Sequence, residues 1–213
     1  MKLALGIIAT NEEIPLTRFL PGLATAFKGE VIGIDYGSTD KTTDLFRQYC
    51  KTTVVDVWPR DFSVAKNKLI GVAESAGYDW LMVLDADETM NYGEIPLIEK
   101  YIEQNTYENY YLPRLGFYDE GLIEASARTF PDLQSRLFKL KAGFSYKHPV
   151  HTQLCQHDQN VYERDIGATI PNIFIYHYPS LRGPKHTLLR QIERKGMEMG
   201  WPPIHSVEAD VVD

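Results

Sequence analysis

Apolar and polar positions follow a regular pattern in the first half of the chain, where short apolar runs alternate with longer amphipathic segments. Apolar runs of strand length cover residues 3–10, 30–36, 52–58 and 79–87. Segments with apolar residues at helical spacing follow them, around 16–27, within 37–50, at 63–77 and from 95 to 101. This alternation predicts an α/β fold with a mostly parallel central sheet and helices on both faces.

Polar and glycine residues mark where two of these helices begin and end. One of Ser38, Thr39 or Asp40 is expected to cap the second helix, because their side-chain oxygens can accept its first backbone N–H groups. Ser63 is expected to cap the third helix in the same way, and Gly77 to close it.

After about residue 105 the pattern changes to short, aromatic-rich strands. We expect these strands over residues 109–118, 135–140 and 172–178. A last helix, around 184–199, would turn one apolar face inward, made of Leu188, Leu189, Ile192 and Met199. No repeat or clear linker interrupts the chain, so the second half is expected to extend the sheet of the first, within one domain over residues 1–213.

Polar side chains follow each of the four apolar runs. In sheets of this kind, ligands bind just beyond the carboxyl ends of the strands. We therefore expect one ligand-binding rim, built from residues 10–12, 35–40, 58–67 and 85–87.

The stretch LMVLDADET, residues 81–89, leads an apolar strand directly into three carboxylates. If extended geometry continues, Asp85 and Asp87 point to one side and Glu88 to the other. Two carboxylates at close range suit Mg²⁺ or Mn²⁺, and such a cation would also remove their mutual repulsion. An ordinary acidic loop is the alternative, but the position of the pair on the predicted rim favours a metal.

Asp35 and residues 37–40, Gly-Ser-Thr-Asp, form a second polar cluster on the rim. Asp35 is expected to face a ligand, because a carboxylate at a strand end has no capping duty, and Ser38 can present its hydroxyl to the same ligand. The chain contains neither GxxxxGK[ST] nor GxGxxG, which argues against a P-loop and a dinucleotide fold.

Composition narrows the functional classes. The net charge is −7 with no block of lysines or arginines, so the basic footprint of a nucleic-acid-binding protein is missing. Cys50 and Cys155 lack metal-site spacing and fit a reducing cytoplasm. The first apolar run meets acidic residues where a signal peptide has its cleavage site, and no run approaches the roughly 18 residues of a membrane span. We expect a cytoplasmic protein without nucleic-acid partner or transmembrane segment.

Four segments, in this order and at these spacings, resemble the family 2 glycosyltransferases with the GT-A fold: ATNEE (9–13), IDYGSTDKT (34–42), WPRDFSVAKNKLI (58–70) and DWLMVLDADE (79–88). The likeness is greatest to the bacterial subgroup that includes lipopolysaccharide-core glucosyltransferase-like proteins. It implies inverting transfer of a sugar from a nucleoside diphosphate sugar, with a UDP-sugar favoured, to a glycan, lipid-linked or protein acceptor. Residues 1–105 would be the nucleotide-binding half, and 106–213 the acceptor-side half with the C-terminal helix.

The resemblance also implies roles for single residues. It places a nucleoside beside Thr10, Asn11, Glu12 and Asp35, and a diphosphate near Lys66 and Asn67. Lysine at position 66 stands where the family has arginine, which keeps the charge but loses the bidentate fork. A solvated helix face is the alternative for it.

Three further residues are assigned to a metal by the same resemblance. Asp85 and Asp87 would hold the sugar diphosphate through Mn²⁺ or Mg²⁺, with Asp87 the direct ligand. His177 aligns with a late histidine that approaches the metal or the diphosphate, although packing is the usual role of a histidine between two tyrosines.

The catalytic base is not at the position where the family keeps it. HPVHTQL (148–154) resembles a Val-His-Glu segment, but Thr152 stands in place of the glutamate. An inverting displacement needs a base to accept the proton of the attacking hydroxyl. Asp132, His151 and Asp158 are the substitutes, with a structural role the alternative for His151.

Two other functions are compatible with the predicted fold. A sugar nucleotidyltransferase would share the sheet and the metal, but such enzymes carry GxGxRxxP after the first strand, whereas residues 9–21 here read ATNEEIPLTRFLP. A non-catalytic nucleotide-sugar binding module is the second alternative, which Thr152 favours. The sequence specifies neither the donor sugar, nor the acceptor, nor the oligomeric state.

Overall fold

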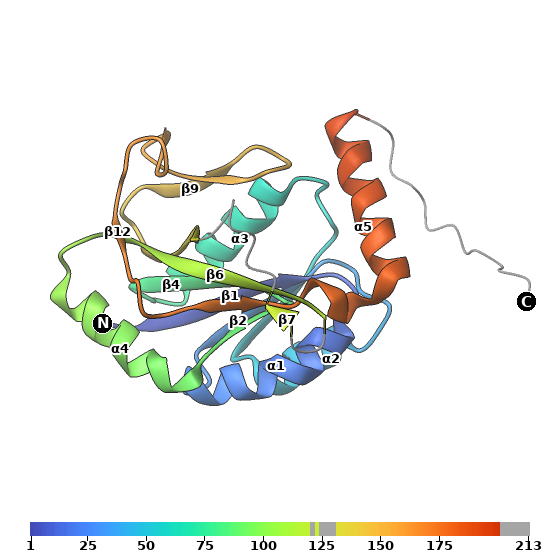
Figure 1. The fold of residues 1–213 in the computed structure, drawn as a ribbon, viewed down its shortest axis with the longest axis horizontal. Helices are drawn as coiled ribbons and strands as arrows, with labels where there is room; N and C mark the ends of the chain where they lie inside the picture. Colours follow the sequence, from blue (N-terminus) through green and yellow to red (C-terminus); the bar gives the residue numbers. More distant parts are fainter. Residues whose placement is uncertain (120–121, 124–130, 201–213) are drawn as a thin grey trace, which may run out of the picture.

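Four parallel strands and three helices alternate over residues 3–85 of the chain (Figure 1). The computed structural model describes residues 1–119, 122–123 and 131–200. The strands are β1 (Leu3–Ala9), β2 (Val31–Asp35), β3 (Thr52–Val55) and β4 (Trp80–Asp85), and the helices are α1 (Glu13–Ala26), α2 (Thr42–Tyr49) and α3 (Phe62–Ser75). β1 lies between β2 and β4, so that Leu5 is opposite both Val31 and Met82. The predicted α/β alternation is confirmed.

The second half continues this sheet, as expected, in the order β3-β2-β1-β4-β8-β6-β13-β5. Its strands are β5 (Glu88–Met90), β6 (Asn109–Asp119), β7 (Leu122–Ile123), β8 (Asp132–Lys139), β12 (Ala168–Thr169) and β13 (Ile175–His177), and its helices are η1 (Tyr92–Glu94), α4 (Ile95–Gln104), η2 (Pro179–Arg182) and α5 (Gly183–Glu198). β8 runs antiparallel to β4 and β6, and β5 antiparallel to β13. A separate three-stranded sheet, which the apolar pattern did not predict, consists of β9 (Phe144–Lys147), β10 (Gln153–Gln156) and β11 (Gln159–Asn160).

Two hydrophobic cores lie on opposite faces of the main sheet. One includes Leu20 of α1 and Trp80 of β4, and the other includes Leu69 of α3 and Phe138 of β8. Figure 1 shows α1, α2 and α4 along one face and α3 with β9 along the other. The sheet is therefore covered on both sides, and its carboxyl-end rim is left to carry polar groups.

The helix caps in the structure agree in part with those predicted from the sequence. Asp40, one of the three candidates for α2, accepts the N–H of Thr42 at 2.9 Å and the N–H of Glu13 at 3.0 Å, so it joins the starts of two helices. Ser63 is not the cap of α3. Asp61 is, because its extended backbone lets its carboxylate reach the N–H groups of Ser63 and Val64. The N–H of Gly77, at φ 79°, bonds back to the end of α3 as predicted.

α5 lies at the side of the fold, beyond the end of the sheet (Figure 1). The expected inward apolar face is wrong at two of its positions, since Ile192 and Met199 are 37% and 54% exposed. The side chains of Leu188 and Leu189 lie outside the described residues.

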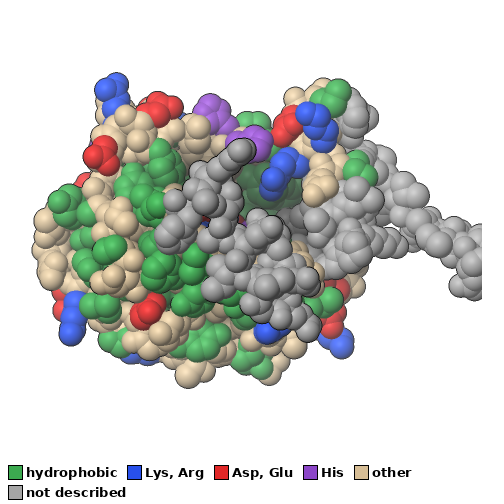
Figure 2. All heavy atoms as spheres, in the orientation of Figure 1, with side chains coloured by type: hydrophobic (Ala, Val, Ile, Leu, Met, Phe, Trp, Pro, Cys, Tyr) green, Lys and Arg blue, Asp and Glu red, His purple; other side chains and the backbone are tan. Residues whose placement is uncertain are grey.

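The surface of the described residues carries charges of both signs. Figure 2 shows Lys, Arg, Asp and Glu side chains scattered over one face among hydrophobic ones. No helix in the described ranges is long and apolar enough to cross a membrane.

Phe46 of α2 should carry a large share of the packing between α2 and the sheet. It is fully buried, and its ring lies so close to Gly33 that a Cβ there would be 2.6 Å from it. Phe46→Ala is expected to lower the free energy of unfolding by about 3–5 kcal/mol in urea denaturation, because it leaves a cavity. Val57→Ala, at an 82% exposed position, is the control and should change it by less than about 0.5 kcal/mol. A Phe46→Ala loss as small as the control's would contradict this packing.

Candidate active site

The loops after β1 and β2 are bound to each other, as the predicted rim requires. The N–H of Asn11 donates to Ser38 Oγ at 2.8 Å, and Asn11 Oδ1 accepts the N–H of Thr39 at 2.8 Å. The N–H of Glu12 donates to Thr42 Oγ1 at 2.8 Å. Residues proposed to contact a nucleoside thus form one continuous wall. Thr10 joins it through Oγ1, 3.3 Å from a backbone oxygen of the second loop.

Asp35 is built into this wall. Its side chain is buried, and Oδ1 accepts hydrogen bonds from the N–H and the hydroxyl of Ser38 at 3.1 and 2.5 Å. Oδ2 accepts a hydrogen bond from the hydroxyl of Thr43. Asp35 accepts no backbone N–H of α2, as expected, but the turn after β2 folds back over the strand end and holds its carboxylate. Its contact with a nucleoside stays a prediction.

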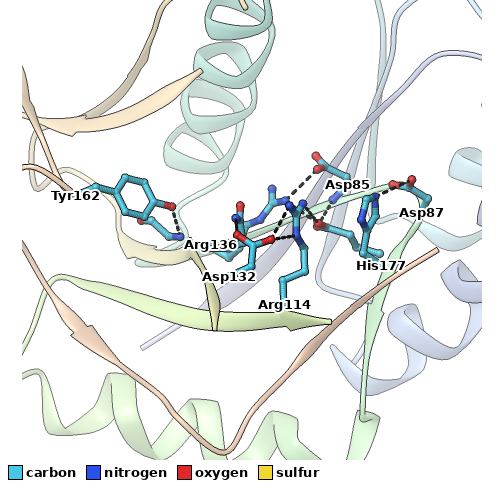
Figure 3. A network of polar contacts seen from close by, with 10 residues as sticks. Asp85, Asp87, Arg114, Asp132, Arg136, Tyr162 and His177 are labelled. Atoms are coloured by element: carbon cyan, nitrogen blue, oxygen red, sulfur yellow. Dashed lines mark hydrogen bonds and ion pairs between the residues drawn. The ribbon is translucent and has the colours of Figure 1, made fainter. Parts of the chain in front are cut away.

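Asp85 ends β4 and forms an ion pair with Arg136 of β8. Arg136 Nη2 lies 2.9 Å from Asp85 Oδ2 (Figure 3), and Arg136 is only 5% exposed. Burial alone raises the pKa of the Asp85 carboxyl, but the charges of Arg136 and Lys66 outweigh it and hold that pKa well below its usual range. Asp85 is thus held ionised by cations of the protein itself.

Glu88 is a fully buried carboxylate within the same network. Its Oε2 accepts the backbone N–H of Asp85 at 3.0 Å, and its Oε1 accepts Arg136 Nη2 at 2.7 Å. The expectation that Glu88 points away from Asp85 is wrong, because extended geometry does not continue: residues 86–87 form a turn between β4 and β5. The turn brings the third acid back beside the first.

Arg114 of β6 connects this network to Asp132. Its Nη1 lies 3.3 Å from Glu88 Oε1, while its Nε and Nη2 lie 2.8 and 2.7 Å from Asp132 Oδ2 (Figure 3). The other oxygen of Asp132 accepts Gln134 Nε2 at 2.6 Å. Asp132, predicted as a candidate base, is therefore in the same chain of charges as Asp85.

A further polar contact joins Asp87 and His177, whose Oδ2 and Nε2 are 3.1 Å apart (Figure 3). The structure thus brings together two of the three predicted metal ligands, while Asp85 turns to Arg136. Within the described ranges, no group of three or more Asp, Glu, His and Cys side chains is arranged around a metal position.

Asp87 and His177 nevertheless fit a divalent cation that takes only one or two ligands from the protein. Mg²⁺-like cations in phosphate-handling sites keep waters and take ligands from the substrate, so one or two protein ligands suffice. Asp87 is 1% exposed and its Oδ2 lies 3.1 Å from His177 Nε2, so the two side chains are near enough to share one cation.

Lys66 and Asn67 are neighbours on α3 with different surroundings. Lys66 Nζ lies 5.1 Å from the ring centroid of Tyr146. Burial lowers the pKa of this lysine, and the nearby Asp85 carboxylate opposes part of the change. Asn67 accepts the N–H of Tyr146 at 2.7 Å and donates to its carbonyl at 2.9 Å. Its amide thus clamps β9 onto α3, and its role beside a diphosphate stays a prediction.

His151 and Asp158 lie outside the charge network. The side chain of His151 is 75% exposed, and its Nε2 is 3.1 Å from Glu198 Oε1 on α5. Asp158 is 82% exposed and pairs with Lys147 at 2.8 Å. Of the three substitutes for the base, only Asp132 shares a network with Asp85.

The fold agrees with what the chain is similar to. The family model "Glycosyl transferase family 2" matches residues 5–166, well over half of the sequence. The chain belongs to glycosyl transferase family 2. It is 28% identical over 155 residues to the SPbeta prophage-derived glycosyltransferase SunS of Bacillus subtilis (strain 168) and to glycosyltransferase SunS of Bacillus phage SPbeta, covering 70% of this chain and 33% of each relative. It thus spans about a third of the length of these two relatives.

Solved structures support the GT-A-type fold of this family 2 chain. S. aureus TarS 1-349 in complex with UDP-GlcNAc has a TM-score of 0.61 at 13% identity, covering 88% of this chain and 61% of that one. Another S. aureus TarS structure has a TM-score of 0.59 at 14% identity, covering 84% and 37%. At these identities the likeness establishes the fold alone.

Sequence reasoning about this family 2 chain missed Arg114, Arg136 and Glu88 as site residues. A usable signal was present for Arg136, because it stands within SRLFKL (135–140), a stretch that the sequence already predicts as a strand. A buried guanidinium requires an acidic partner. The acids after β4 were the available partners, but the pairing of β8 beside β4 is not visible in the sequence.

Asn67 should be needed to hold β9 in place. Asn67→Ala leaves the N–H and the carbonyl of Tyr146 without their partners, so we expect a loss of about 1–3 kcal/mol in the free energy of unfolding, measured by urea denaturation. Val64→Ala, at a 51% exposed position of the same helix, is the control and should stay within about 0.5 kcal/mol. Equal stabilities of the two variants would contradict the clamp.

Asp85 should contribute to the acid sensitivity of the metal-free protein. Its pKa is lowered on folding, so its stabilising contribution is present above the unfolded value of about 3.9 and is lost as the pH falls through the folded value. The free energy of unfolding of Asp85→Asn should therefore fall less than that of the wild type between about pH 4 and pH 2. If the free energies of unfolding of the two proteins fell equally over this pH range, the assigned charge pair would be contradicted.

Proposed function

We propose that this family 2 chain is an inverting glycosyltransferase that moves a sugar from a nucleoside diphosphate sugar to an acceptor hydroxyl. The observation that carries the proposal is the grouping at the carboxyl end of β4, where the Asp87–His177 pair lies beside the network of Asp85, Glu88 and Arg136. Carboxylates that can receive a divalent cation, next to fixed cations, suit a diphosphate leaving group.

A UDP-sugar is the donor that we favour. The TarS structure with a similar fold was solved with UDP-GlcNAc, which supports a nucleotide-sugar donor for the shared architecture. The wall that contains Asn11 and Asp35 lies at the ends of β1 and β2, where a sheet of this type receives its ligand. Lys66 is the cation of α3 that we assign to the diphosphate.

Asp87 and His177 are the residues that we assign to Mn²⁺ or Mg²⁺. When bound, the cation supplies charge that neutralises the departing diphosphate. Asp85, held ionised by Arg136, keeps a second carboxylate directed at the same rim. Glu88 and Arg136 are buried, so in this proposal they act on the substrate through the residues that they hold and not by touching it.

We assign the role of base to Asp132. It is 33% exposed, so an acceptor can reach it, and Arg114 ties it to the network that holds Asp85. His151 is less suitable, because it contacts the end of α5 away from η2, the turn that follows His177. A helix of this length places its two ends on the order of 20 Å apart.

The acceptor is a hydroxyl of a glycan, a lipid-linked sugar or a protein, and the lipopolysaccharide-core-like subgroup stays a prediction from the sequence motifs. Tyr110 and Tyr111 of β6 do not provide a sugar-stacking surface, since both are buried in the two cores. Tyr107 is 45% exposed, but it lies beside the start of β4, at the edge of the sheet opposite the rim, and the side chain of Tyr118 lies outside the described residues.

A donor-binding module without turnover is the second candidate function. It is favoured by the contacts of the candidate bases, since Asp132 accepts hydrogen bonds from Arg114 and Gln134, and His151 is paired with Glu198. UDP binding without transfer to any acceptor in a broad panel would support it.

The test of the proposed enzyme is sugar transfer or donor hydrolysis with UDP-sugars, with and without Mn²⁺. Asp87→Ala should lower kcat at least about 100-fold, because leaving-group stabilisation of this kind contributes several kcal/mol. The exposed acid variant Glu99→Gln is the control and should keep wild-type turnover. Unchanged turnover in Asp87→Ala would refute its role. Pyrophosphate release from a nucleoside triphosphate and a sugar phosphate would instead indicate a nucleotidyltransferase.

A further inference from the structure

Glu88 differs from the other acids of the site in how its two oxygens are used. The residue is fully buried, so it cannot touch a substrate. Oε2 accepts the backbone N–H of Asp85 at 3.0 Å. Oε1 accepts Arg136 Nη2 at 2.7 Å and Arg114 Nη1 at 3.3 Å. One side chain therefore holds the main chain at the strand end and both guanidinium groups of the site.

We propose that Glu88 is the positioning residue of this active site, which fixes Asp85 on the donor side and, through Arg114, Asp132 on the acceptor side. The proposal rests on the proposed function, because it takes Asp85 as a donor-side group and Asp132 as the base. It adds a residue whose role neither the sequence motifs nor the resemblance assigns.

The shared donor of Arg136 is the reason that Glu88 controls Asp85. A single nitrogen, Nη2, lies 2.9 Å from Asp85 Oδ2 and 2.7 Å from Glu88 Oε1. Glu88 thus restrains Arg136 from moving fully onto Asp85. Without that restraint the guanidinium can close on Asp85, whose main chain has also lost its acceptor. Both the backbone and the carboxylate of Asp85 would then shift.

Glutamine is the most informative replacement for Glu88. It has nearly the same shape, but its amide offers one acceptor oxygen and one NH₂ donor, where the carboxylate offers two acceptor oxygens. If the oxygen faces Arg136, the NH₂ faces the N–H of Asp85, and the reverse orientation sets the NH₂ against two guanidinium groups. One side of the network is lost in either orientation.

Arg114 carries the same restraint to the acceptor side. Its Nε and Nη2 both bind Asp132 Oδ2, while its Nη1 reaches Glu88. This arrangement sets the angle of Asp132 relative to Asp85 across β6 and β8. The separation of the Asp85 and Asp132 carboxylates is therefore fixed. A fixed separation keeps the acceptor hydroxyl aligned with the donor sugar that it attacks.

The test compares the binding of UDP and of uridine, by calorimetry in the presence of Mn²⁺, in wild type and in Glu88→Gln. The affinity for uridine measures binding to the nucleoside wall. The additional affinity for UDP measures binding of the diphosphate near Asp85. We expect UDP affinity to fall at least tenfold in Glu88→Gln, uridine affinity to change less than threefold, and kcat to fall at least tenfold. Glu99→Gln removes a carboxylate that pairs with Lys28 on the surface, and should leave all three values unchanged.

The double variant Glu88→Gln/Arg136→Met separates positioning from charge balance and serves as the test if the single variant does not fold. Replacing both partners of a buried ion pair by neutral groups is often tolerated, and Arg114 keeps its contact with Asp132. A ratio of UDP to uridine affinity that stays at least tenfold below wild type supports the proposal. A ratio restored to wild type overturns it, because neutralising Arg136 is then all that Glu88 does.

The outcomes distinguish this proposal from the proposed function. If wild type binds UDP with Mn²⁺ and Glu88→Gln binds it equally well, Glu88 has no positioning role and the proposed function stands. If wild type does not bind UDP, the proposed function fails and takes the role of Glu88 with it.

Discussion

The buried pairing of Glu88 with Arg136 is the constraint on which the arrangement of the site depends. Both residues are 5% exposed or less, and each leaves an uncompensated buried charge if the other is removed. The pair joins the turn after β4 to β8, and Arg114 extends it to Asp132. Because a buried charge must keep its partner, these segments are fixed relative to one another.

The same pairing explains how crowded acids are tolerated at the end of an apolar strand. Asp85 and Glu88 share one guanidinium nitrogen, and Asp87 turns to His177. The repulsion between Asp85 and Glu88 is therefore relieved by a guanidinium of the chain itself, and the proposed function leaves Asp87 and His177 to hold a divalent ion. Glu88 and Arg136 thus form a structural charge pair, whereas Asp87 and His177 form a pair that can receive a ligand.

Parts of the fold and site that depend on local pattern could be predicted from the sequence. The strands before Asp35 and Asp85 are apolar runs, so the positions of these carboxylates at strand ends follow directly. Predictions that assumed continued local geometry failed: Glu88 is turned back by residues 86–87, and Asp61 replaces Ser63 as the cap of α3. In both cases the local course of the backbone decided the outcome, and the residue types alone do not fix it.

The sequence by itself determined the α/β class, the four polar segments that follow the apolar runs and the likeness to family 2, because each rests on residue types and their order along the chain. Only the tertiary structure decided which charges meet. Arg136 and Asp85 are 51 residues apart, and His177 and Asp87 are 90 apart. They meet because β8 pairs beside β4 and β13 beside β5. Strand pairing between distant segments depends on the whole core, so no local pattern could have assigned Asp85 to an arginine.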